Sequence, residues 1–263
     1  MQLEPRAGRV RLVGAGPGPA DLLTVRALRA VEGAQALLYD ALVAEEVVAL
    51  APRACLKIQT GKRAFEASMA QAAINRLMLR LARRGLDVVR LKGGDPSIFG
   101  RVGEEHEYLR SHGLEVEVVP GVTAACAAAA QFGFPLTHRG EARSLLILTA
   151  TVANGAIPQG GWAGANDPEA TLALYMGRDR AAAVADQLVR QGRSTSTPAI
   201  AVENAGHADA RAIASTLGGL AAAMHAAQPT GPVVLLIGEV AARADVLFEG
   251  RSDGAGISRT ARP

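Results

Sequence analysis

Short apolar runs alternate along this chain with longer stretches of helical periodicity, and this alternation limits the fold more than any other feature. Such alternation is typical of β-α units stacked around a mostly parallel sheet. It predicts an α/β fold, in two groups of four strands separated by a polar stretch. The strands are expected at residues 9–13, 34–39, 88–91, 116–119, 145–150, 171–175, 199–202 and 233–238.

Helices are predicted between these strands. Ile74, Leu77, Met78 and Leu81 form one apolar stripe, and Gly85 follows where a C-terminal cap is needed. A second helix is expected to start at Asp21 as its N-cap and to run to about residue 31. Further helices are predicted over the alanine-rich residues 123–130 and around residues 184–188.

The polar stretch suggests two domains in one chain. We expect an N-terminal α/β domain over residues 1–137, a linker over 138–143 and a C-terminal α/β domain over 144–250. Residues 251–263 consist mainly of Gly, Ser and Arg without periodicity, and we expect a disordered tail there.

Composition excludes several classes of protein. Lys and Arg exceed Asp and Glu by 28 to 25, and this surplus of +3 is spread along the chain. It therefore predicts no nucleic-acid arm and no membrane-binding patch. No apolar run reaches the length of a membrane span, and the first residues lack a signal-peptide pattern. The two cysteines have no partner motif, so we expect a reduced, cytoplasmic protein without a metal site.

The first strand leads into a glycine-rich turn, Gly14-Ala15-Gly16-Pro17-Gly18-Pro19. A strand, a glycine turn and a helix suggest a dinucleotide site, but that fingerprint requires a third glycine where Pro19 stands. The two prolines also remove backbone donors that a pyrophosphate would need. A dinucleotide oxidoreductase is thus disfavoured, while the turn still offers bare backbone for close approach by a ligand.

The stretch RLKGGDPSIFGRVGEE at residues 90–105 is the most informative in the chain. It places Gly93-Gly94-Asp95 at the carboxyl end of a strand, where open α/β sheets bind ligands. Asp95 can accept hydrogen bonds there. A second strand-to-helix turn follows at PGVTA, residues 120–124, and two such turns on one sheet edge predict one crevice.

Together with LLYDALV, TGKRA, FPLTHR, ALYMG, AVENA and VVLLIGEV, these motifs resemble the tetrapyrrole methylases that use S-adenosylmethionine. The resemblance is collinear over about residues 9–240. It implies two α/β domains with the cofactor in a cleft between them, and a homodimer. Within the family, the chain is most similar to members that methylate uroporphyrinogen III at carbons 2 and 7, giving precorrin-2 and S-adenosylhomocysteine. Because the pattern begins near residue 9, a stand-alone methylase is expected.

The resemblance also assigns residues. Asp40 or Glu104 is implied as proton acceptor and Lys62 as proton donor, with Arg101, Arg63 and Arg139 as anchors for substrate carboxylates. The cofactor-binding positions that it implies are Pro17, Gly93, Gly94, Asp95, Ile98, Thr123, Ala124, Met176, Ala205, Gly231 and Pro232.

Departures from the family pattern cluster on the expected tetrapyrrole side. Phe65, Ala67 and Ala70 stand where relatives have Gly, His and Pro. Ala150-Thr151 replaces a usual Gly-His, and Gly140 an Asp. Cofactor binding is therefore the firmer expectation. A methylase of another corrin precursor, or a non-catalytic cofactor-binding paralogue, remains an alternative.

Overall fold

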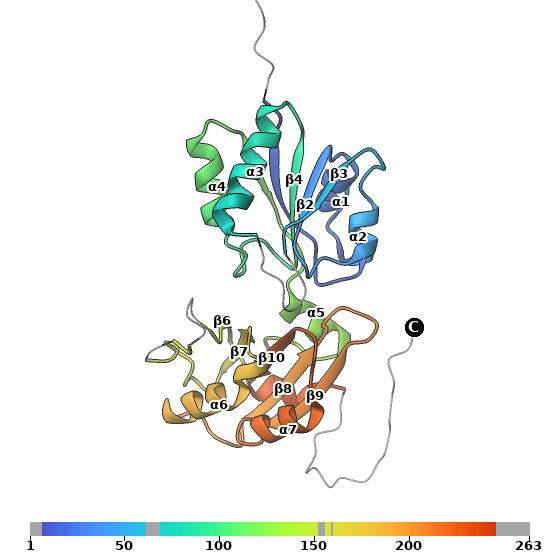
Figure 1. Ribbon diagram of the computed structural model, residues 1–263. Helices are drawn as coiled ribbons and strands as arrows, with labels where there is room; N and C mark the ends of the chain where they lie inside the picture. The colour runs from blue at the N-terminus through green and yellow to red at the C-terminus, as the bar shows by residue number, and fades with distance from the viewer. Residues whose placement is uncertain (1–6, 62–68, 152–155, 159, 246–263) are drawn as a thin grey trace, which may run out of the picture. The chain divides into compact units, whose positions relative to one another are not determined.

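The computed structural model describes residues 7–61, 69–151, 156–158 and 160–245. Contacts divide the chain into two compact units, one of residues 1–131 and 203–211 and the other of 132–202 and 212–263. Each unit contains one five-stranded sheet with helices packed on it (Figure 1). The expected α/β class is thereby confirmed. The first change of unit falls between residues 131 and 132, upstream of the expected linker. Two more fall at 202/203 and 211/212, inside the expected C-terminal domain, and the expected tail lies outside the described residues.

The first sheet has the strand order β3-β2-β4-β1-β5, and all of its neighbouring strands run parallel. Its strands are β1 (Val10–Gly14), β2 (Ala36–Tyr39), β3 (Leu56–Gln59), β4 (Val88–Lys92) and β5 (Val116–Val119). Its helices are α1 (Val25–Glu32), α2 (Glu45–Ala49), α3 (Gln71–Arg83), α4 (Val102–Ser111) and α5 (Ala124–Gln131).

Side-chain alternation along the buried strands divides the first core in two. Val13, Val89 and Leu91 pack with α1 and α2 on one face. Val10, Leu12 and Val88 pack with α3 and α4 on the other. Because successive strand residues point to opposite faces, Arg90 and Lys92 must share the α3–α4 face with Val88. This alternation places the buried charges on the α3–α4 face.

The second sheet has the order β6-β7-β10-β8-β9 and mixes parallel and antiparallel neighbours. Helices α6 (Ala181–Arg190) and α7 (Leu220–Ala227) pack on its apolar core. Its strands are β6 (Ser144–Thr149), β7 (Ala170–Tyr175), β8 (Pro198–Glu203), β9 (Arg211–Thr216) and β10 (Val233–Ile237).

Two strands were missed by the apolar-run criterion, and both lie at the edge of a sheet. β3 and β9 end their respective strand orders, which makes each sheet five-stranded instead of four-stranded. An edge strand packs against one neighbour only and buries less of its surface. Leu56 of β3 is 48% exposed, and most of β9 is half-buried, so neither strand has the continuous apolar run of a central strand.

The helix expected to start at Asp21 is also corrected. Ala20–Leu22 form a short 3-10 turn, the chain is extended at Leu23, and α1 begins at Val25. Thr24 is the N-cap, because its Oγ1 accepts the N–H of Ala27 at 3.1 Å. The predicted C-terminal cap of α3 is confirmed, since Gly85 follows Arg84 with a left-handed φ of 85°.

Candidate functional site

Three glycine turns meet at the carboxyl end of the first sheet. Gly94 donates its N–H to the carbonyl of Gly16 at 2.7 Å, and Gly16 donates in return to Gly94 at 3.2 Å. A Cβ on Gly121 would lie 2.3 Å from the Gly94 oxygen and 2.9 Å from the Cα of Gly14. Only glycines allow these backbones to touch. The three motifs found in the sequence therefore form one structural feature.

Asp95 joins two of these turns. Its Oδ1 accepts the N–H of Ser97 at 2.7 Å, and its Oδ2 accepts the N–H of Gly121 at 3.0 Å. Gly94 has a left-handed φ of 67°, and a Cβ there would meet nothing within 4 Å. Bare backbone at Gly94 thus faces open space while Asp95 holds the surrounding turns in place.

A fourth loop, residues 203–207, packs on the first glycine turn. A Cβ on Gly206 would lie 2.7 Å from Cγ of Pro17, and one on Gly18 would lie 2.4 Å from Nε2 of His207. Gln131, at the end of α5, donates to the carbonyl of His207 at 2.9 Å and accepts the N–H of Gly206 at 2.9 Å. Two predicted cofactor positions that are distant in sequence, Pro17 and Ala205, are thereby carried by adjacent loops.

The remaining predicted cofactor residues of this unit border the same turns. Thr123 directly precedes α5, and its carbonyl accepts the N–H groups of Cys126 and Ala127. Ala124 begins α5, and Ile98 is half-buried in the loop after Asp95.

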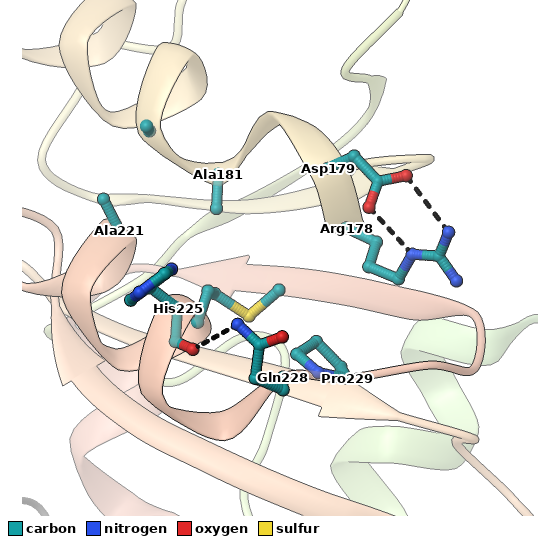
Figure 2. Close-up of a pocket in the computed structure, with 9 residues that line it drawn as sticks. Arg178, Asp179, Ala181, Ala221, His225, Gln228 and Pro229 are labelled. Carbon is teal, nitrogen blue, oxygen red and sulfur yellow. Dashed lines mark hydrogen bonds and ion pairs between the residues drawn. The ribbon is translucent and has the colours of Figure 1, made fainter.

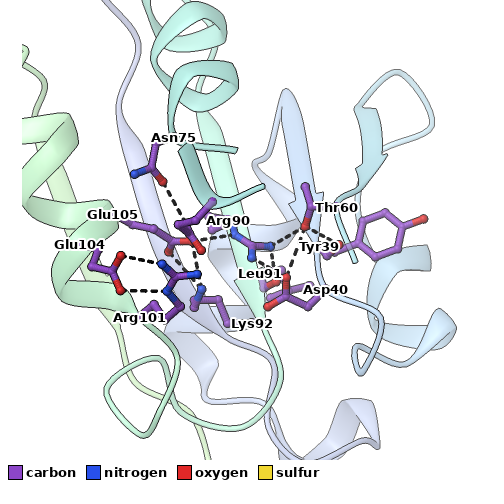
Figure 3. Close-up of polar contacts among 11 residues, drawn as sticks. Tyr39, Asp40, Thr60, Asn75, Arg90, Leu91, Lys92, Arg101, Glu104 and Glu105 are labelled. Atoms are coloured by element: carbon purple, nitrogen blue, oxygen red, sulfur yellow. Dashed lines mark hydrogen bonds and ion pairs between the residues drawn. The ribbon is translucent and has the colours of Figure 1, made fainter. Parts of the chain in front are cut away.

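A buried polar cluster lies on the α3–α4 face of the same sheet (Figure 3). Glu105, fully buried on α4, accepts hydrogen bonds from Nε of Arg90 at 3.2 Å and from Nζ of Lys92 at 3.1 Å. Nη2 of Arg90 also pairs with Oδ1 of Asp40. Two buried cations are therefore balanced by two carboxylates, as burial of charge requires.

Neutral groups complete this cluster. Nη1 of Arg90 donates to Oγ1 of Thr60 at 3.1 Å, and the Thr60 hydroxyl lies 3.3 Å from Oδ1 of Asp40. Gln71 of α3 donates to Oε1 of Glu105 at 2.9 Å. Burial lowers the pKa of Lys92 below its ordinary 10.5, and the nearby Arg90 charge lowers it further, while Glu105 and Asp40 oppose this shift.

The predicted pair Arg101 and Glu104 lies apart from this buried set. Both side chains are more than half exposed, and they form a two-point ion pair, with distances of 2.8 Å and 2.7 Å. This hydrogen bonding lowers the pKa of Glu104 below its ordinary value. Arg101 is the N-cap residue of α4 and has a left-handed φ of 55°.

The second unit carries the other predicted cofactor residues. Met176 follows β7 with a left-handed φ of 58° and is 52% exposed, so it does not fill the core. Nη1 of Arg178 donates to the carbonyl of Thr230 at 2.6 Å and thereby joins the Met176 loop to the loop of Gly231 and Pro232. Figure 2 shows Arg178 paired with Asp179. Both line an open hollow of about 250 Å³ together with residues of α6 and α7.

Of the three predicted substrate-side residues Lys62, Arg63 and Arg139, only Arg139 lies within the described residues. Arg139 is exposed in the loop after His138, whose Nδ1 lies 2.9 Å from the Arg139 carbonyl oxygen. Lys62 and Arg63 lie outside the described residues, as do Phe65 and Ala67.

In the described ranges, no group of three or more His, Cys, Asp or Glu side chains is placed to hold a metal ion. No helix in those ranges is long and apolar enough to cross a bilayer.

Sequence reasoning missed Arg90, Lys92, Glu105 and Thr60. A signal was present, because Arg90 and Lys92 stand in a strand that is otherwise apolar. Polar residues at alternate positions of a buried strand require partners on the same face. The partner could not be named, since Glu104 and Glu105 are equally plausible until the phase of α4 is known.

The model of a protein family, Tetrapyrrole (Corrin/Porphyrin) Methylases, matches residues 9–221. The chain belongs to this family. Among curated tetrapyrrole methylases, it is 43% identical to a uroporphyrinogen-III C-methyltransferase of Paracoccus denitrificans, covering 90% of this chain and 83% of that relative. It is 45% identical to a siroheme synthase of Azotobacter vinelandii, covering 94% of this chain.

The chain spans about half the length of the siroheme synthases that it matches, 54% in the Azotobacter case. Among solved methylase structures, a uroporphyrin-III C-methyltransferase of Thermus thermophilus complexed with S-adenosylhomocysteine matches with a TM-score of 0.77 at 41% identity. That match covers 90% of this chain and all of the Thermus chain.

Proposed function

We propose that this chain is a C-methyltransferase that uses S-adenosylmethionine to methylate uroporphyrinogen III at carbons 2 and 7, giving precorrin-2 for siroheme or cobalamin. The observation that carries the proposal is the meeting of the turns at Gly16, Gly94 and Gly121, beside open space at Gly94. Two relatives at more than 40% identity support it, because the Paracoccus protein is named a uroporphyrinogen-III C-methyltransferase and the Thermus protein a uroporphyrin-III C-methyltransferase.

On the cofactor side, we assign two kinds of contact. Gly93, Gly94, Thr123 and Ala205 supply backbone groups, while Ile98, Ala124 and Pro17 supply apolar walls. Met176, Gly231 and Pro232 are assigned to the same cofactor from the second unit. Their loops fit such a role, since Met176 is exposed in a left-handed conformation and Arg178 joins its loop to that of Gly231. S-adenosylmethionine itself supplies an electrophilic methyl group.

The protein must then orient the pyrrole carbon and accept one proton. We assign proton acceptance to Asp40 or Glu104 and proton donation to Lys62. Arg101 would bind a substrate carboxylate with its planar fork, in exchange for the exposed Glu104 that it now holds. Arg63 and Arg139 are proposed to bind other carboxylates. The proposed protein is a cytoplasmic homodimer.

The deciding experiment combines the purified protein with S-adenosylmethionine and enzymatically made uroporphyrinogen III. We expect the absorbance of precorrin-2 or its oxidised product, and a mass increase of two methyl groups. A second arm titrates the protein with S-adenosylhomocysteine in a calorimeter. Heat without turnover would favour another acceptor or a non-catalytic paralogue, and no heat would overturn the proposal.

A further inference from the structure

The parallel register brings the candidate base Asp40 into one row with buried polar groups. Leu38 of β2 pairs with Ile58 of β3 and with Arg90 of β4. Asp40, Thr60 and Lys92 each follow one of these residues by two positions. They share the α3–α4 face because side chains alternate along a strand. Asp40 therefore begins the loop after β2, level with Thr60 after β3 and with Lys92 at the end of β4.

The side-chain contacts of Asp40 come from Thr60 and from Arg90, and they involve only one oxygen of its carboxylate. Oδ1 of Asp40 pairs with Nη2 of Arg90 and lies 3.3 Å from the Thr60 hydroxyl. In the part of the chain that the structure describes, no hydrogen-bond partner contacts Oδ2. The Asp40 side chain is 33% exposed, whereas Thr60 and Arg90 are 3% and 2% exposed as residues.

The orientation of Arg90 is itself fixed from the opposite side. Its Nε donates to Glu105, and Glu105 is held in turn by Lys92 and Gln71. Figure 3 shows Arg90 between Glu105 on one side and Thr60 with Asp40 on the other. A guanidinium with fixed donors at both ends cannot follow a moving carboxylate, so it favours one rotamer of Asp40.

We propose that Thr60 and Arg90 are positioning residues that hold Oδ1 of Asp40 and leave Oδ2 directed toward the substrate. This inference rests on the proposed function of Asp40 as proton acceptor. Thr60 contributes through one hydroxyl, which accepts from Arg90 and shares its proton between Asp40 and the carbonyl of Tyr39, 3.1 Å away. None of these contacts involves a residue assigned to the cofactor.

The test is a double-mutant cycle on methyl transfer. Thr60→Val keeps the shape of the side chain but removes the hydroxyl, and Thr60→Ser keeps the hydroxyl. We expect Thr60→Val to lower kcat about tenfold, as the loss of one hydrogen bond of about 1.4 kcal/mol would. Thr60→Ser should stay within about twofold of the wild type, because it retains the hydrogen bond. The dissociation constant of S-adenosylhomocysteine should not change in either variant.

The cycle is completed with Asp40→Asn and the double variant Thr60→Val/Asp40→Asn. If Thr60 acts through Asp40, the double variant is no slower than Asp40→Asn alone. If Thr60→Val slows both backgrounds by the same factor, the positioning role is overturned while Asp40 keeps its assignment. If Asp40→Asn turns over like the wild type, the assignment of Asp40 falls and the inference with it. Thermal unfolding of each variant identifies any that fail to fold.

Discussion

The carboxylate of Asp95 accepts the backbone N–H of Gly121, 26 residues further along the chain, at 3.0 Å. This bond joins the turn after β4 to the turn after β5, while β1 lies between the two strands in the sheet. The acidic residue of the GGD motif therefore has a structural role besides any contact with a ligand. Close packing of the glycines and this charged hydrogen bond maintain the same geometry.

Replacing Gly121 tests that packing. Gly121→Ala places a Cβ 2.3 Å from the Gly94 oxygen, so the turns must separate. We expect unfolding to become easier by about 2 kcal/mol, as in overpacked cores, and S-adenosylhomocysteine to bind at least about tenfold more weakly. Urea denaturation and calorimetry measure both effects.

Gly103→Ala is the matched control, because a Cβ at this position of α4 meets nothing within 4 Å. It should stabilise the protein by about 0.5–1 kcal/mol through lower chain entropy. Wild-type cofactor affinity in Gly121→Ala would contradict the close-packed site.

The buried charge balance predicts a large effect at Glu105. Glu105→Gln leaves Arg90 and Lys92 buried with one carboxylate fewer. Breaking such a pair on one side costs about 3–5 kcal/mol. The unfolding free energy from urea denaturation measures it. Glu107→Gln changes an exposed glutamate of the same helix and should leave the unfolding free energy unchanged. Equal effects in the two variants would refute the charge balance.

The lowered pKa of Lys92 predicts that the stability of the protein depends on pH. Its pKa in the folded protein is below the ordinary 10.5, so between these two values the unfolded chain binds more protons than the folded one. Stability must therefore rise with pH in that window. Lys92→Met removes this contribution. We expect the unfolding free energy of the wild type to gain on that of Lys92→Met as the pH rises toward 10.5. A constant or shrinking difference would exclude the lowered pKa.

In the second unit, buried Arg193 donates hydrogen bonds to three backbone carbonyls, those of Ala165, Asp167 and Ala170. Burial lowers its pKa below the ordinary range. Arg193→Met leaves these carbonyls without their donor, and we expect a loss of about 3 kcal/mol. Arg190→Met, at an exposed position of α6, should stay within about 0.5 kcal/mol of the wild type. Thermal unfolding distinguishes the two.

Most strands and the family motif could be predicted from the sequence alone. Eight apolar runs correspond to strands, and the strands buried on both faces, such as β2 and β10, have a continuous apolar sequence. The motif at residues 90–105 and the resemblance that it carries led to the family that the comparisons establish. β3 and β9 escaped detection because each is a half-exposed edge strand with at most two Leu, Ile or Val residues, whereas the edge strands β5 and β6 have three or more. Thr24 caps α1 where Asp21 had been expected.

Local sequence determined where the turns fall, because glycine and proline act on the backbone at their own positions. Tertiary structure decided which groups meet. Only the strand order places the turns of β1, β4 and β5 side by side, and only the parallel register sets Asp40 level with Thr60 and on the same face as Arg90. Only the phase of α4 buries Glu105 and exposes Glu104. Such pairings depend on contacts between residues distant in the sequence, and their energies arise only once the chain has packed.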